Sequence, residues 1–152
     1  GRYEEARRLH DECVALRREV GDMWVVAISL NNLGNLARDQ GDYPEAGARY
    51  RESLKIVREY NDRWAMAYLL EDMGCLACRQ GQHERALRLA GAAEALRQAI
   101  GSPRSAAEQQ KLDDGLRSAL QAAGDARARH LLDDGRDMSF DATVAYAAES
   151  AV

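Results

Sequence analysis

The feature that most constrains the fold of this chain is a repeat with a step of 40 residues. The segments GRYEEA, GDYPEA and GQHERA begin at Gly1, Gly41 and Gly81. Further breaks lie halfway along the periods, so that six residues interrupt the chain every 20 positions: Gly1, Gly21, Gly41, Asn61, Gly81 and Gly101. Gly and Asn tolerate the left-handed backbone that ends a helix, and the Asp or Ser after each halfway break can accept the first free N–H groups of the next helix. Each break therefore predicts the end of one helix and the start of another.

Between the breaks, apolar residues recur three or four positions apart, as on one face of an α-helix. The first stripe is Trp24, Ala27, Leu30, Leu33 and Ala37. One period later the equivalent stripe is Trp64, Ala67, Leu70, Met73 and Ala77. The intervening helix carries Tyr43, Ala46, Tyr50, Leu54 and Val57. These stripes predict an all-α fold, an α-α superhelix built from antiparallel helix hairpins.

The residues of one hairpin resemble the tetratricopeptide repeat family. That family carries Leu-Gly and Ala in its first helix and Ala, an aromatic residue and a small residue in its second. Here these places are filled by Leu30, Leu33-Gly34, Ala37, Ala46, Tyr50 and Ser53. The step of 40 residues is longer than the family's usual 34, as in its longer-helix variety. The resemblance covers about residues 1–101.

After Gly101 the period ends, and residues 102–152 are predicted to form helices that cap the repeats, since an open stack of helix pairs needs its last apolar face covered. Ser105 and Glu108 form a capping-box pattern at the start of a helix. Gly124 is expected to end that helix, and a shorter helix should follow over residues 126–134. Ser139 is the candidate N-cap of a last helix over residues 140–149. The predicted domains are therefore 1–101 and 102–152.

Two stretches near the C-terminus carry a second resemblance. LAGAAEALRQAIGSP and DDGRDMSFDATVAYA are similar to the C-terminal repeat region of bacterial STAND-type signal-transduction ATPases and of LuxR-type and SARP-type transcriptional regulators. This resemblance implies a sensor or scaffold segment of a cytoplasmic bacterial regulator, with any ATPase chemistry elsewhere in the parent chain. A general protein-protein adaptor without a transcriptional role is the alternative.

Composition excludes several classes of function. The formal net charge is −4, and Arg is spread through the chain, so the basic face that nucleic-acid binding needs is not expected. No apolar run is long enough to cross a membrane. Three cysteines are too few for a disulfide framework and favour a reducing cytoplasm. No phosphate-binding loop or nucleophile elbow occurs, so we expect no enzyme activity and no cofactor.

The resemblance to tetratricopeptide repeats implies that the first helix of each pair lines a concave groove. Its expected groove positions are Ile28, Asn31, Asn32, Asn35 and Arg38 in one repeat, and Tyr68, Glu71, Asp72, Cys75 and Arg79 in the next. Such a groove would bind a protein or peptide, including another part of the parent chain, or a small-molecule effector. The alternative is that these positions are only solvated helix surface. Glu71 and Asp72 predict a preference for cationic or neutral polar ligands over acidic ones.

The motif CLAC, which carries Cys75 and Cys78, is followed by His83 and could suggest zinc or redox chemistry. A structural zinc site generally needs four ligands, and a redox pair is expected at a helix N-terminus. Here the cysteines fall within a predicted helix, and the only other histidines are the scattered His10 and His130. We therefore expect packing residues and no metal site.

The beginning of the sequence lies inside a repeat and lacks an initiator Met, which predicts a fragment of a longer protein. Residues 2–20 would then be the second helix of a pair whose first helix lies outside the sequence. Its apolar stripe is Tyr3, Ala6, Leu9, Cys13 and Leu16. Exposed apolar faces of this kind tend to pair, and a symmetric homodimer is predicted.

Overall fold

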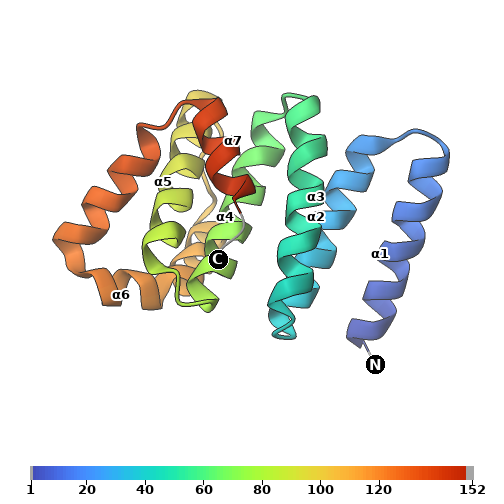
Figure 1. The fold of residues 1–152 in the computed structure, drawn as a ribbon, viewed down its shortest axis with the longest axis horizontal. Helices are drawn as coiled ribbons and strands as arrows, with labels where there is room; N and C mark the ends of the chain where they lie inside the picture. The colour runs from blue at the N-terminus through green and yellow to red at the C-terminus, as the bar shows by residue number, and fades with distance from the viewer. Residues whose placement is uncertain (1, 150–152) are drawn as a thin grey trace. The chain divides into compact units, whose positions relative to one another are not determined.

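The computed structural model describes residues 2–149, which form seven α-helices and no strand (Figure 1). The helices are α1 (Arg2–Glu19), α2 (Met23–Asp39), α3 (Tyr43–Glu59), α4 (Arg63–Arg79), α5 (His83–Ala99), α6 (Ala106–Arg136) and α7 (Phe140–Ala148). The predicted all-α fold of successive helix hairpins is confirmed. Gly1, the first residue of the repeat pattern, lies outside the described residues.

The helices α1 to α5 end at the breaks that the sequence predicts. Positive φ angles occur at Gly21, Gly41, Asn61, Gly81 and Gly101. Asp22 and Asp42 accept a hydrogen bond from the backbone N–H three residues on, at Val25 and Glu45. The prediction for Ser102 is wrong, because α6 begins only at Ala106 and Ser105 is its N-cap. The chain runs through Pro103 in between, and Pro disfavours a helical backbone in the residue before it.

The chain divides into two compact units after Asp62. In the first unit, α2 packs against both α1 and α3. Tyr50 of α3 is fully buried, and a Cβ on Gly34 of α2 would lie 2.4 Å from its ring. The Leu-Gly pair of the sequence pattern is thus explained, because only glycine leaves room for this tyrosine.

The second unit contains α4 to α7. α5 packs against α4 and α6, α6 also contacts α4, and α7 contacts α5. Two glycines allow α5 and α6 to cross with their backbones in close approach. A Cβ on Gly91 would lie 2.0 Å from the Leu132 carbonyl oxygen, and a Cβ on Gly135 would lie 2.0 Å from that of Arg88.

Helix α6 is bent at Gly124, whose φ of 72° and ψ of 164° are not helical. It therefore consists of two helical halves, as predicted, and the second half runs on to Arg136. Both predicted caps are present, since Ser105 and Glu108 form a capping box and Ser139 accepts from Ala142 N–H. The division predicted at residue 101 rests on the end of the repeat period and stays a prediction.

The two tryptophans that begin the predicted apolar stripes are not part of the core. Trp24 is 40% exposed and Trp64 is 45% exposed, whereas the other members of both stripes are buried. Trp24 donates its indole N–H to Asp62 over 2.8 Å. An indole carries a polar donor on a large apolar ring, and this donor is satisfied at the surface.

Candidate binding site

The groove positions predicted on α2 divide into two groups. Ile28, Asn31 and Asn32 are half-buried. Asn35 and Arg38 are engaged inside the first unit, because the Tyr50 hydroxyl donates to Asn35 Oδ1 over 2.7 Å and lies 3.3 Å from Arg38 Nη1. Arg38 is buried. These two side chains therefore orient Tyr50.

On α4, four of the predicted positions come together in a recess. Tyr68, Glu71, Asp72 and Cys75 line it together with three residues of α6 that were not among the predicted groove positions: Glu108, Lys111 and Leu112. Arg79 is exposed at the last position of α4 and does not line the recess. The spacing of 108, 111 and 112 places the new members on one face of a helix, which is the signal that could have identified them.

Glu71 differs most from its predicted role as a groove carboxylate that faces the ligand. Its side chain is only 11% exposed and is held by two arginines. Arg97 of α5 donates from Nε and Nη2 over 2.5 and 3.0 Å, and Arg104 donates from Nε over 2.8 Å. Neither arginine was among the predicted groove positions, and both lie further along the chain than Glu71. Glu71 lines the recess, but its negative charge is compensated from within the second unit.

Tyr68 and Glu108 are coupled across the recess. The Tyr68 hydroxyl donates to the Glu108 carboxylate, and Arg97 lies 4.3 Å from the centre of the Tyr68 ring. The hydrogen bond to Glu108, assisted by burial, raises the pKa of Tyr68 above its usual value. The same bond, together with hydrogen bonds from Ser105, lowers the pKa of Glu108 to about 2.

The pKa of Arg97 is raised as well. Burial by itself would lower it, but hydrogen bonds with Glu71 and Tyr68 favour the charged guanidinium. Arg97 thus remains a cation beneath the recess, joining Tyr68 to the Glu71 ion pairs. This network fixes the ring that forms one wall of the recess.

The cysteines of CLAC are used in helix packing. The Cys78 Sγ lies 3.0 Å from the Ser118 Oγ of α6. Cys75 faces Gly115, where a Cβ would approach its Sγ to 2.5 Å. Within residues 2–149, no three His, Cys, Asp or Glu side chains gather in a way that could hold a metal ion.

Across residues 2–149, none of the helices combines the length and the apolar composition that crossing a membrane requires.

Comparison with known proteins gives one family. Two family models, both described as tetratricopeptide repeat, match residues 25–99 and residues 1–20, which together are more than half of the chain. No curated protein and no solved structure matches it. The matched residues span the helix pair α2–α3 and the pair α4–α5, which show the hairpin packing and the Leu-Gly pattern described above. The chain therefore belongs to the tetratricopeptide repeat family.

Proposed function

We propose that the protein is a non-catalytic interaction module that holds a segment of a partner protein against the recess between α4 and α6. The observation that carries this proposal is the convergence of Tyr68, Asp72, Glu108 and Lys111 beside the apolar Leu112. Such a mixture of an aromatic ring, an apolar wall and a few polar groups suits the side chains of a peptide. Tetratricopeptide repeats typically mediate protein-protein interaction, which supports a protein partner. Ile28, Asn31 and Asn32 stay proposed contacts on α2.

The chemistry of the recess favours an amide or ammonium group on the ligand. The carboxylates of Asp72 and Glu108 can accept hydrogen bonds from such a group, and the low pKa of Glu108 keeps its carboxylate charged at neutral pH. Glu71 contributes little to this preference, because Arg97 and Arg104 compensate its charge. The preference that the sequence placed on Glu71 and Asp72 is therefore proposed here for Asp72 and Glu108.

The proposal can be tested with three fluorescein-labelled peptides of equal length that differ only in carrying Lys, Gln or Glu at the same positions. Fluorescence anisotropy should show tighter binding of the Lys and Gln peptides than of the Glu peptide. Asp72→Asn should weaken the Lys peptide by up to about fivefold, since exposed charge pairs contribute less than about 1 kcal/mol. The loss should shrink at high salt.

Asp114→Asn is the matched control, because Asp114 is exposed on α6 outside the recess. It should leave all three affinities unchanged. Equal binding of the Lys and Glu peptides by the unmodified protein would contradict the proposal.

We further propose that this module is the C-terminal sensor or scaffold segment of a cytoplasmic bacterial regulator, either a STAND-type signal-transduction ATPase or a LuxR-type or SARP-type transcriptional regulator. The support is the similarity of the two C-terminal stretches. A small-molecule effector in the same recess and a general adaptor role are the alternatives. The gene sequence upstream of the codon for residue 1 would discriminate between the regulator and the adaptor. A phosphate-binding loop or a DNA-binding domain there supports the regulator, and further repeats alone support the adaptor.

A homodimer is proposed from the exposed face of α1. Tyr3, Leu9 and Leu16 are all at least half exposed, and apolar faces of this kind commonly mark interfaces. Sedimentation at micromolar concentration should give twice the chain mass of 16.9 kDa. A Leu9→Glu and Leu16→Glu double variant should sediment as a monomer. A monomer for the unmodified chain would refute the dimer.

A further inference from the structure

A second pocket lies inside the second unit, away from Tyr68 and Asp72. Its volume is about 300 Å³, at the lower end of the range for small-molecule sites. Its apolar lining comes from α5 and from both halves of α6: Leu87, Ala90, Leu112, Leu116, Leu120 and Leu132. Its polar lining is Glu94, Arg104, Gln109, Asp113 and Arg136.

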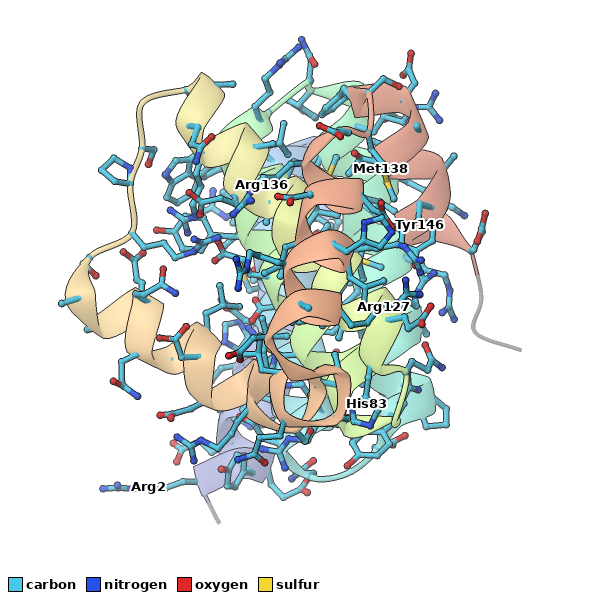
Figure 2. The ribbon with its side chains drawn as sticks, turned by 90° about the vertical axis from the view of Figure 1, so that its left-hand side faces the viewer. Arg2, His83, Arg127, Arg136, Met138 and Tyr146 are labelled. Carbon is cyan, nitrogen blue, oxygen red and sulfur yellow. The ribbon has the colours of Figure 1, made fainter. Side chains whose placement is uncertain are left out.

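Two features of the backbone create this pocket. At Gly124 the two halves of α6 diverge, and Figure 2 shows Arg136 on the second half, at the end away from this bend. The glycine contacts at Gly91 and Gly135 hold the second half directly against α5. The first half therefore leaves space beside α5, and its leucines face that space.

Arg104 supplies a buried donor at the edge of the pocket. Its side chain is 6% exposed, its Nε is bonded to Glu71 and its Nη1 to Glu94 and Gln109. Its Nη2 is buried and has no hydrogen-bond partner among the described residues. A buried donor left in this state is unfavourable, so an acceptor placed there would be favoured.

The charges around the pocket are balanced. Glu94 and Asp113 offset Arg104 and Arg136, and all four side chains line the pocket. Burial would raise the pKa of Glu94, but Arg104 and Arg136 help to hold it below its usual value. An anionic ligand would gain attraction from the arginines and suffer repulsion from the carboxylates, so an uncharged acceptor fits better.

We propose that this pocket binds an uncharged amphipathic small molecule whose apolar body packs against the leucines of α6 and whose carbonyl or hydroxyl oxygen accepts from Arg104. The pocket shares only Leu112 with the peptide recess, and the proposed ligand goes beyond the interaction function. The ligand lies between α5, which belongs to the repeats, and the bent helix α6, which follows the repeats.

The probe is 6-propionyl-2-dimethylaminonaphthalene, an uncharged naphthyl ketone whose emission shifts to shorter wavelength in an apolar site. It should bind saturably to one site on the full chain. Its affinity should be at least about tenfold higher than that of the anionic 8-anilinonaphthalene-1-sulfonate, which corresponds to about 1.4 kcal/mol of binding free energy. Leu120→Trp places an indole in the pocket and should weaken the ketone by at least about tenfold. Leu16→Trp adds the same indole on α1 and should leave binding unchanged.

Hydrogen exchange on the unmodified protein provides a second measurement, which is needed if Leu120→Trp fails to fold. The ketone should protect amides in residues 109–120 and 132–136 and leave α2 and α3 unaffected. The proposal is overturned by the absence of saturable binding, by equal affinity for the sulfonate, or by a folded Leu120→Trp variant that binds as well as the unmodified chain. Protection confined to the residues around Tyr68 and Asp72 would also overturn it, while leaving the peptide recess in place.

Discussion

At the scale of single residues, the second unit is organised around one buried carboxylate. Glu71 accepts from Arg97 and Arg104, and Arg104 also contacts Glu94. Removing such charges from water is costly. The buried ion pairs of Glu71 are tolerated because several hydrogen bonds form between the charged groups at once. The Glu71 network therefore acts as a fixed junction between α4, α5 and the segment before α6.

Glu71→Gln should destabilise the protein by about 3–5 kcal/mol, because it removes the carboxylate that pairs with the buried Arg97 and leaves Arg104 paired with Glu94 alone. The measurement is the midpoint of urea unfolding followed by circular dichroism. Asp72→Asn, at the next position but half-buried, should shift the free energy of unfolding by less than about 1 kcal/mol. Similar losses for the two variants would show that the Glu71 ion pairs contribute no more than an exposed charge.

The Tyr68–Glu108 hydrogen bond predicts a pH dependence. The pKa of Glu108 falls from an ordinary 4.5 to about 2 in the folded protein, so its contribution to stability is complete above about pH 4.5 and is lost as the pH falls towards 2. The stability difference between the unmodified protein and Glu108→Gln should therefore shrink across this interval. Urea unfolding at a series of pH values measures it. A difference that stays constant down to pH 2 would contradict the assigned pKa.

At the scale of elements, α6 departs most from a regular repeat. A single residue, Gly124, separates its two halves, with a backbone conformation that is essentially confined to glycine. The bend allows α6 to contact α4 with its first half while its second half crosses α5. The pocket proposed above depends on this bend.

Gly124→Ala should destabilise the protein by about 1–3 kcal/mol, the usual cost of a strained backbone conformation. The expected loss does not come from a steric clash, because a Cβ on Gly124 would meet no atom within 4 Å. Gly47→Ala is the control, since Gly47 lies in a helix and its Cβ would meet only the end of the Arg51 side chain. It should be neutral or stabilising by up to about 1 kcal/mol. Thermal unfolding of both variants is the measurement, and a neutral Gly124→Ala would show that the bend is not strained.

At the scale of the whole molecule, residues at equivalent positions of the repeat differ in their burial. Leu16, Ile56 and Leu96 are 40 residues apart in succession. Leu16 is 62% exposed, whereas Ile56 and Leu96 are each 7% exposed. Among the described residues, α1 packs mainly on α2, whereas α5 packs on both α4 and α6, so the outer apolar face of α1 is not covered as the corresponding face of α5 is.

Leu16→Ala and Leu96→Ala make the same chemical change at equivalent positions. Leu96→Ala should cost about 2–5 kcal/mol, because it removes buried methyl groups and leaves a cavity. Leu16→Ala should change the stability by less than about 0.5 kcal/mol, as is usual for surface positions. Urea unfolding at low protein concentration compares them without a contribution from association. Equal losses would mean that Leu16 is buried in the protein in solution.

The local features of this fold were determined by the sequence itself. Five of the helix breaks, the capping box at Ser105 and the bend at Gly124 were predicted from residue type and spacing alone. These features depend on backbone preferences and on hydrogen bonds between residues three or four positions apart. The class of fold followed as well, because a stripe of apolar residues on each helix can be buried only by packing helices together.

The tertiary structure decided which of the candidate side chains remain accessible to a ligand. Glu71 was predicted as a groove carboxylate, but its partners, Arg97 and Arg104, lie 26 and 33 positions further along the chain, beyond the reach of any helical spacing rule. Leu16 and Leu96 are likewise indistinguishable by type and position in the repeat. Local sequence sets the face of a helix on which a side chain stands, whereas contacts between distant segments determine whether that face meets water, an ion pair or another helix.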